Sequence, residues 1–376
     1  MSRFLLVVPP FVGHVNPVVG VAAELTRRGH EVAWAGHGEL ITRLAGAVRT
    51  YDCALPAVTP RPPELRGAAA LKFLWEEGFL PLAAAMAPGV EAAIAAFRPD
   101  ALLVDQQAVA GGLIAERLGL PWLTSATTSA ELTDPLASMP KVRDWVLDRL
   151  TGLRTAIGDP DGTADPRFSP HGVVAFTTAE LAGEMRGVRF VGPSIGDRES
   201  TVDFPWEWLD HRPTVLVTLG TANVDAGTRF LAECAATGVR AVLADPAGAI
   251  PSSDTVLSRP YLPQLALLPK MDAVVCHGGH NTVCETLWHD LPLVVAPIRD
   301  DQPVIAEQVA EAGAGVRVRF TKATAEHLRI AISTVLDPGS GMRANAARIG
   351  RSFRAAGGAA AAATELEALT MAGVRA

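Results

Sequence analysis

A pattern of strand, loop, helix and strand occurs twice in this chain, once at the N-terminus and once after residue 212. Each copy has two short apolar runs with a helix-compatible segment between them. The first copy comprises residues 4–8, 18–28 and 31–35, and the second comprises residues 214–218, 230–237 and 240–244. A helical crossover lets consecutive strands lie parallel, so such units build sheets with helices on both faces. Two copies in 376 residues predict an α/β chain with two doubly wound, Rossmann-like domains.

The loop of the first copy predicts where its helix begins and ends. Pro9 and Pro10 stop the first strand. Asn16 is a suitable N-cap and Pro17 suits the first helical position, so we expect the helix to begin there. Gly29 follows two arginines and predicts the C-terminal end of the helix.

Composition shifts predict the domain boundaries. Residues 191–213 are rich in glycine, proline and charge, as linkers often are. We expect an N-terminal domain at 1–195, a linker at 196–212, a C-terminal domain at 213–355 and a C-terminal helix at 356–376. The glycine pair at 357–358 should interrupt the helical tail, which could pack across both domains.

Charge and cysteine content exclude several classes of function. The formal net charge is −7, from 33 basic and 40 acidic residues, and no basic stripe marks a surface for nucleic acid or anionic lipid. Four cysteines without framework spacing favour a reducing, cytoplasmic location. No uninterrupted apolar run reaches about 18 residues, so we expect no integral membrane segment.

The most informative stretch lies between residues 261 and 302. A strand at 273–276 leads into the tight turn 277–279, and a helix follows from about residue 281 to 289. Glycines let the backbone approach a ligand, and a helix N-terminus presents amide hydrogens and a positive dipole end. This arrangement is an anion site suited to phosphate. Further hydrogen-bonding side chains lie on the same stretch: His277, Asn281, Thr282 and, one helical turn on, Glu285.

This stretch closely resembles the nucleotide-sugar signature of the family 1 glycosyltransferases. The match comprises an aromatic-x-Pro-Gln element at 261–264, a His-x-Gly-x-Asn-Thr-x-x-Glu element at 277–285 and an Asp-Gln pair at 301–302. The resemblance covers essentially the whole chain, more loosely in the N-terminal half. It implies the GT-B fold, in which two Rossmann-like domains face each other across a cleft. It also implies a nucleotide diphosphate sugar as co-substrate, with no other cofactor and no metal.

The resemblance assigns a role to each donor-site residue. Tyr261 stacks on the base, Gln264 contacts base or ribose, and Glu285 binds ribose. His277, Gly279, Asn281, Thr282 and Thr221 face the diphosphate, and Asp301 and Gln302 hold sugar hydroxyls. Many family members carry Trp where Tyr261 stands, although the smaller ring can still stack. This difference leaves dTDP and UDP donors both open.

Other interpretations of the same residues remain. Cys276, His277, His280 and Cys284 could form a zinc quartet, although their spacing fits no usual template. Residues 301–302 could be an ordinary solvated loop. Residues 159–161 read Asp-Pro-Asp, which resembles the metal-binding motif of a different glycosyltransferase fold, but their Gly/Pro context favours a turn.

A histidine and an aspartate form the candidate catalytic pair. His14 follows the first strand, and Asp105 ends the apolar run 101–104; both should lie at the carboxyl edge of the sheet, where such folds bind ligands. A neutral histidine can take the proton of an acceptor hydroxyl while a carboxylate orients its ring. The family carries its base in the Gly-His-x-x-Pro loop and an Asp partner, matched here by His14 and Asp105. Alternatively, His14 is a plain polar loop residue and Asp105 a helix N-cap.

The N-terminal domain should supply the acceptor pocket. The apolar helical segment 71–97 contributes Phe73, Trp75 and Phe79, and the hydroxyl-rich segment 122–131 contributes Thr127. These side chains would suit a small hydrophobic acceptor with a few polar groups. Ordinary packing in a helix core explains the same aromatic residues equally well.

The prediction is an inverting, metal-independent O-glycosyltransferase, monomeric or homodimeric. It would transfer a hexose from a dTDP- or UDP-sugar to a hydroxyl of a small hydrophobic natural product. Composition rich in Ala, Gly and Arg hints at an antibiotic or pigment pathway. Alternatives are C- or N-glycosyl transfer on the same scaffold, a nucleotide-sugar epimerase, and a catalytically silent auxiliary protein.

Overall fold

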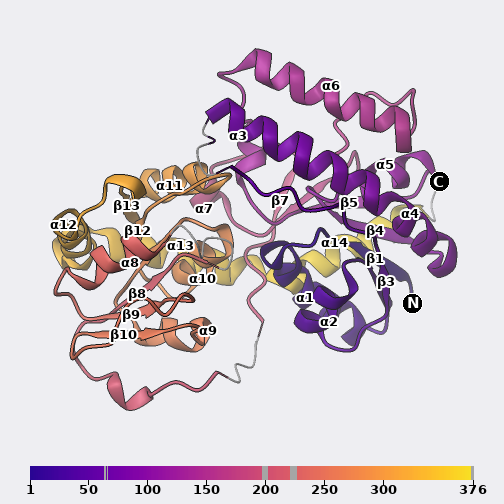
Figure 1. The fold of residues 1–376 in the computed structure, drawn as a ribbon. Helices are drawn as coiled ribbons and strands as arrows, with labels where there is room; N and C mark the ends of the chain where they lie inside the picture. The colour runs from indigo at the N-terminus through magenta and orange to yellow at the C-terminus, as the bar shows by residue number, and fades with distance from the viewer. Residues whose placement is uncertain (63–64, 66, 197–201, 221–226, 374–376) are drawn as a thin grey trace. The chain divides into compact units, whose positions relative to one another are not determined.

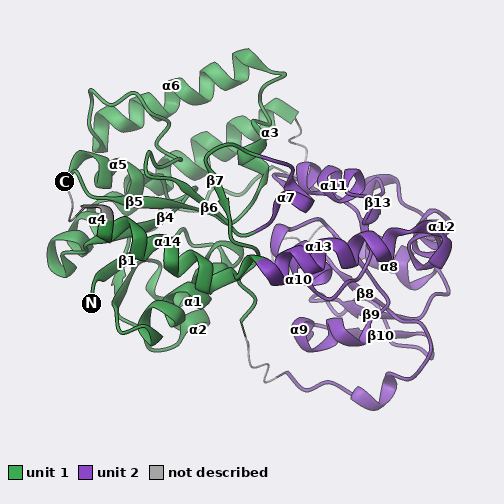
Figure 2. Ribbon diagram, turned by 180° about the vertical axis from the view of Figure 1, so that it is seen from behind, with its two compact units in different colours: residues 1–176, 185–196, 356–376 green, residues 177–184, 197–355 purple. Residues whose placement is uncertain are grey.

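The computed structural model of the 376-residue chain describes all residues except 63–64, 66, 197–201, 221–226 and 374–376. It contains two compact units, coloured separately in Figure 2. Unit 1 comprises Met1–Phe176, Met185–Gly196 and Ala356–Ala376, and unit 2 comprises Thr177–Glu184 and Asp197–Ala355. The short segment Thr177–Glu184 groups with unit 2 although it precedes the linker that the sequence predicts.

Unit 1 is built on a parallel sheet of seven strands in the order β3-β2-β1-β4-β5-β6-β7. Most of these strands are labelled in Figure 1. The strands are β1 Arg3–Val7, β2 Glu31–Gly36, β3 Thr50–Asp52, β4 Ala101–Asp105, β5 Trp122–Ala126, β6 Val173–Ala175 and β7 Val188–Phe190. Its helices are α1 Val12–Arg27, α2 Gly38–Ala45, α3 Gly67–Phe73, α4 Leu80–Phe97, α5 Val109–Arg117, α6 Pro140–Ile157 and α14 Gly358–Gly373, with a π-helical segment at Leu74–Phe79 and a 3-10 turn at Ala130–Thr133. Successive residues of β1 point to opposite faces. Leu5 packs among residues of α4 and α5, whereas Leu6 packs among residues of α1 and α14, so helices cover both faces.

Unit 2 repeats the architecture with six parallel strands in the order β10-β9-β8-β11-β12-β13. The strands are β8 Val215–Thr218, β9 Ala241–Ala244, β10 Val256–Arg259, β11 Ala273–Cys276, β12 Leu293–Val295 and β13 Gly315–Arg317. Its helices are α7 Ala179–Ala182, α8 Thr228–Ala235, α9 Gln264–Leu267, α10 His280–Trp288, α11 Gln302–Glu311, α12 Ala325–Leu336 and α13 Met342–Ala356, with 3-10 turns at Trp206–Trp208, Leu268–Lys270, Phe320–Lys322 and Pro338–Ser340. The predicted fold class, α/β with two doubly wound domains, is confirmed.

The start of α1 differs from the sequence prediction. The helix begins at Val12 with Phe11 as its N-cap, so Asn16 does not cap it and Pro17 lies inside it. Pro17 cannot donate to the carbonyl of Gly13, which costs one helical hydrogen bond. Val15, Pro17 and Val18 are buried, and their packing outweighs that loss. His14 therefore lies in the first helical turn and not in a loop.

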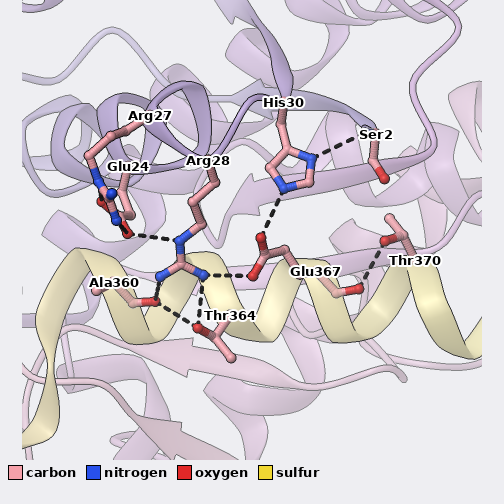
Figure 3. Close-up of polar contacts among 9 residues, drawn as sticks. All are labelled: Ser2, Glu24, Arg27, Arg28, His30, Ala360, Thr364, Glu367 and Thr370. Carbon is pink, nitrogen blue, oxygen red and sulfur yellow. Dashed lines mark hydrogen bonds and ion pairs between the residues drawn. The ribbon is translucent and has the colours of Figure 1, made fainter.

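Polar contacts attach the C-terminal helix α14 to α1 and β2 (Figure 3). The guanidinium of Arg28 donates to Glu367 at 2.6 Å and to the carbonyl of Ala360 at 2.9 Å. His30 Nδ1 accepts from the backbone amide of Ser2, so its Nε2 carries the hydrogen and donates to Glu367 at 2.9 Å. These contacts lower the pKa of Glu367, the hydrogen bond from His30 contributing most. The preceding break at Gly357–Gly358 is where the sequence places it, and both glycines have positive φ.

One long helical segment contains an 18-residue window of high mean hydropathy. Gly67–Phe97 runs continuously for 31 residues, and by length and composition it is the one described helix able to cross a membrane. Its residues Leu82, Met86 and Val90 are nevertheless buried in the core of unit 1. It therefore packs here as a core helix of unit 1.

Candidate functional site

The order of the strands in unit 1 brings two distant loops together. β1 lies between β2 and β4. The strands that follow β1 are added on one side of it up to β3, and β4 starts the other side, so the order of strands reverses between β1 and β4. Val7 pairs with Val104, which places the carboxyl ends of these two strands side by side. Ligand sites of open α/β sheets lie at this position. His14 follows β1, and Asp105 is the last residue of β4.

His14 and Asp105 are in direct contact. His14 Nδ1 lies 3.0 Å from each carboxylate oxygen of Asp105. The Asp105 side chain is fully buried, whereas that of His14 is 16% exposed. An ionised carboxylate only accepts hydrogen bonds, so Nδ1 carries the ring hydrogen and the basic lone pair is on Nε2. The predicted pair is thus assembled with the geometry of a general base and its orienting carboxylate.

Thr127, predicted to bind the acceptor, contacts both members of this pair. Its hydroxyl donates to Asp105 Oδ2 at 2.8 Å, and its oxygen lies 2.7 Å from His14 Nδ1. The backbone amide of Gln107 donates to the other oxygen, Asp105 Oδ1, at 2.8 Å. Asp105 therefore has a donor on each oxygen besides the imidazole. It is not the N-cap of α5, which is Ala108.

Charged residues that the sequence analysis did not single out lie beside the pair. The side-chain amide of Gln107 donates from Nε2 to Glu131 Oε1 at 3.3 Å, and Arg167 donates from Nη1 to Glu131 Oε2 at 3.4 Å. Burial raises the pKa of Glu131, and the nearby charge of Arg167 opposes this effect. Glu131 and Arg167 are 36 residues apart, and no local motif marks either of them.

The predicted acceptor aromatics lie around the π-helical segment. Leu80 N–H bonds to the Trp75 carbonyl, five residues back, which is the π pattern. Trp75 is buried in the core of unit 1 and meets Phe79 edge to face, with ring centroids 5.3 Å apart. Phe73 ends α3 and is half-buried. The burial of Trp75 favours core packing for that residue, while Phe73 and Phe79 keep some exposure.

The turn after β11 in unit 2 has the geometry of an anion site. Gly279 is the N-cap of α10, which begins at His280, and Gly278 has φ +90°. A Cβ on Gly279 would lie 2.5 Å from His277 Nε2, and a Cβ on Gly278 would lie 3.2 Å from the Gln302 carbonyl. A side chain at Gly278 would also be strained by the positive φ, whereas one at Gly279 would require the His277 ring to move. The first-turn amides of α10, which include those of Asn281 and Thr282, precede the first intrahelical bond, from Val283 N–H to the Gly279 carbonyl.

His277 is neutral at physiological pH. Burial lowers its pKa to about 4, and a backbone hydrogen bond with Thr218 only partly offsets this effect. Arg299 lies close enough to lower that pKa further. Arg299 is a cation beside the predicted diphosphate turn, and the sequence analysis missed it because it lies just outside the matched Asp-Gln pair.

Gln264 and Glu285, which the family resemblance assigns to the nucleoside, are in direct contact. Gln264 Nε2 donates to Glu285 Oε2 at 2.6 Å, although the two residues lie 21 positions apart. Glu285 is buried on α10, and Gln264 begins α9. Tyr261 lies just before α9 with 70% of its surface exposed, so its ring is open to stack on a ligand.

The loop before α11 holds the predicted Asp-Gln pair. Asp301 is the N-cap of α11, and Gln302 is buried. The side-chain oxygen of Gln302 accepts from the amides of Ile298 at 2.9 Å and Arg299 at 3.1 Å. Gln302 therefore shapes its own loop, and its side-chain NH₂ is the group suited to a ligand. Asp300 adopts φ +55°, a strained value for a non-glycine residue.

Two further predictions concern Thr221 and metals. Thr221 lies outside the described residues. Within the described ranges, no three or more His, Cys, Asp and Glu side chains are arranged to hold a metal ion. Asp159 and Asp161 form the predicted turn, in which the Asp159 carboxylate accepts from the amide of Asp161. All four cysteines are buried, and none forms a disulfide.

Comparison with known proteins gives a consistent result. Residues 231–369 match the family model described as "Erythromycin biosynthesis protein CIII-like, C-terminal domain". The chain is 28% identical to 4'-demethylrebeccamycin synthase of Lentzea aerocolonigenes, covering 93% of this chain and 94% of that protein. It is 28% identical to demethyllactenocin mycarosyltransferase of Streptomyces fradiae, with 98% and 87% covered.

Solved structures share the fold over nearly the whole chain. The glycotransferase of kitacinnamycin superposes with a TM-score of 0.79 at 24% identity, and 98% of each chain is covered. The glycosyltransferase VinC, solved with dTDP, superposes with a TM-score of 0.74 at 21% identity, covering 98% of this chain and 99% of that one. Two parallel sheets and these structures show that the chain has the GT-B fold, and over nearly its whole length its sequence is similar to those of glycosyltransferases.

Proposed function

We propose that the chain transfers a hexose from a dTDP- or UDP-sugar to a hydroxyl of a small hydrophobic natural product, with inversion at the anomeric carbon. The observation that carries this proposal is the contact between His14 and Asp105 at the junction of β1 and β4. The antibiotic-pathway relatives support a natural-product acceptor, and the VinC complex supports a thymidine diphosphate donor. We assign acceptor binding to unit 1, donor binding to unit 2, and the location to the cytoplasm.

His14 would act as the general base. Its Nε2 takes the proton of the acceptor hydroxyl while the oxygen attacks the anomeric carbon. Asp105 holds the ring through Nδ1 and stabilises the imidazolium that forms. The bond from the anomeric carbon to the diphosphate oxygen breaks as the new glycosidic bond forms. A single displacement of this kind inverts the configuration.

The donor would bind to the turn at 277–279 and the residues around it. The N-terminal amides of α10 and the side chains of Asn281 and Thr282 donate hydrogen bonds that stabilise the negative charge of the departing diphosphate. Neutral His277 acts there as a hydrogen-bond donor, and Arg299 supplies positive charge. Gln264 and Glu285 bind the nucleoside, Tyr261 stacks on its base, and Asp301 with Gln302 binds sugar hydroxyls. Thr221 is proposed at the phosphates through the family resemblance alone.

Product analysis tests this function. The full chain is incubated with UDP- and dTDP-sugars and a panel of aromatic aglycones, and the products are identified by mass. The anomeric proton coupling of each product is then measured by NMR. An α-linked donor should give a β-linked O-glycoside. Hydrolysis or epimerisation of the donor without transfer would instead support the epimerase or auxiliary-protein alternatives.

A further inference from the structure

Glu131 in unit 1 has fewer hydrogen bonds than its surroundings demand. Its side chain is only 19% exposed. Among the described residues it accepts two side-chain hydrogen bonds, from Gln107 at 3.3 Å and Arg167 at 3.4 Å, and both are long. An ionised carboxylate has about four acceptor positions and prefers shorter bonds to charged donors. A mostly buried carboxylate with two long bonds is under-satisfied.

Arg167 does not neutralise Glu131 fully because another carboxylate holds it more tightly. Arg167 Nη2 donates to Asp165 at 2.6 Å, and its Nε contacts both Asp165 oxygens at 3.0 and 3.2 Å. The guanidinium also lies over the rings of Trp75 and Phe168, at 5.8 and 5.4 Å from their centroids. Two carboxylates share one cation, so this cluster carries a net charge of −1 when both are ionised.

Gln107 connects this cluster to the candidate base. Its backbone amide donates to Asp105 at 2.8 Å, and its side-chain amide donates to Glu131. Glu131 is therefore one residue removed from the carboxylate that orients His14. The charges of Asp105 and His14 both act on Glu131, and burial raises its pKa. A cation or a strong hydrogen-bond donor placed against Glu131 would relieve this unfavourable environment.

We propose that Glu131 is an acceptor-binding residue that selects acceptors carrying a protonated amine near the hydroxyl to be glycosylated, with a second hydroxyl as the weaker alternative. This proposal rests on the proposed function, because it places the acceptor beside His14. An ammonium group would complete the hydrogen bonding of Glu131 and balance the excess negative charge. An acceptor carrying a carboxylate in the same place would be repelled.

Matched fluorescent probes test the proposal without turnover. The probes are an aminomethyl-substituted naphthol, its N-acetyl derivative and its carboxymethyl analogue, titrated into the full chain with no donor present. The wild-type chain should bind the ammonium probe about tenfold more tightly than the N-acetyl probe, as one charge-assisted hydrogen bond allows. In Glu131→Gln this ratio should fall towards one, and in Glu131→Asp it should be intermediate. Glu91→Gln, which removes an exposed carboxylate of the same unit, should keep the wild-type ratio.

Each outcome decides the proposal. Equal binding of the ammonium and N-acetyl probes by the wild-type chain would overturn it, as would an unchanged ratio in Glu131→Gln. Thermal unfolding of each variant establishes that it is folded. If Glu131→Gln does not fold, the binding ratio of Glu131→Asp tests the proposal in its place. The wild-type chain could keep its preference for the ammonium probe and yet form no glycoside from any dTDP- or UDP-sugar. That result would contradict the proposed function and still support Glu131 as a binding residue for the ammonium group.

Discussion

Asp105 is a buried carboxylate whose hydrogen bonds are supplied by three different segments. His14 comes from α1, Thr127 follows β5, and the Gln107 amide follows β4 itself. A buried carboxylate without such donors would be costly to keep ionised. These contacts hold the carboxylate in place, so that Nδ1 of His14 keeps its hydrogen and Nε2 keeps its lone pair.

Thr127 should act through this pair. Thr127→Val removes the hydroxyl that donates to Asp105 and preserves the shape of the side chain, so we expect kcat to fall about tenfold with little change in the acceptor KM. Thr127→Ser keeps the hydroxyl and should retain most of the activity. Steady-state kinetics at saturating donor measure both constants. A raised KM with unchanged kcat in Thr127→Val would show instead the acceptor contact that the sequence predicts.

Buried His277 makes stability depend on pH. Its pKa is about 4 in the folded chain and near the ordinary histidine value of 6.5 when unfolded, so the unfolded state binds more protons between these pH values. The free energy of unfolding should therefore fall as the pH drops, by about 2 kcal/mol between pH 7 and pH 5. His277→Asn should lose this component. Urea unfolding at both pH values measures it, and an equal pH dependence in the two proteins would refute the assignment.

At the scale of elements, the sequence predicted boundaries that local signals set, and it failed where tertiary packing sets them. β11 occupies residues 273–276 as predicted, and α10 begins one residue earlier than expected, because an apolar run ended by glycines is a local signal. The start of α1 was wrong because local capping rules favoured Asn16 and Pro17, whereas tertiary packing extends the helix back to Val12. Pairings such as that of Thr127 with Asp105 arise only from strand order, which no local pattern encodes.

One carboxylate, that of Glu367, accepts several of the polar contacts that attach α14. Glu367 receives hydrogen bonds from Arg28 and His30, and these lower its pKa. A lowered carboxylate pKa stabilises the fold above the unfolded value of about 4.5, and this contribution is lost as the pH falls through the folded pKa. Glu367→Gln should weaken amide hydrogen-exchange protection in α14 at pH 7.

The control for this prediction is a neighbouring residue of the same helix. Glu365 pairs with Arg189 through a more exposed contact, so Glu365→Gln should change protection of α14 less than Glu367→Gln does. Equal protection of α14 in Glu367→Gln and the wild-type chain would show that the Glu367 contacts contribute nothing measurable to holding the helix.

At the scale of the whole molecule, each unit has its own core and its own candidate half-site. The cluster around His14 lies within unit 1, and the turn at 277–279 lies within unit 2. This division follows from the repeated strand and helix pattern of the sequence. In each sheet the winding reverses between two neighbouring central strands, β1 with β4 and β8 with β11, which is where open α/β sheets bind ligands.

Nucleotide binding should therefore slow amide hydrogen exchange in unit 2 and not in unit 1. With dTDP at about 100 times its Kd, the binding free energy adds about 2.7 kcal/mol to the stability of the unit that holds it. Hydrogen exchange of the full chain should slow in α10, in α9 and in the turn at 277–279, with amides of β1 and β4 unaffected. Protection confined to unit 1 would contradict the donor assignment.

The most direct test of the mechanism is the turnover number of His14→Ala with a transferred acceptor at saturating donor. Loss of the general base should lower kcat by about 10²–10⁴-fold. Affinity for dTDP, measured by calorimetry on the same preparation, should stay at the wild-type value because the proposed donor residues lie in unit 2. A kcat equal to that of the wild-type chain would contradict the assignment of His14 as the base.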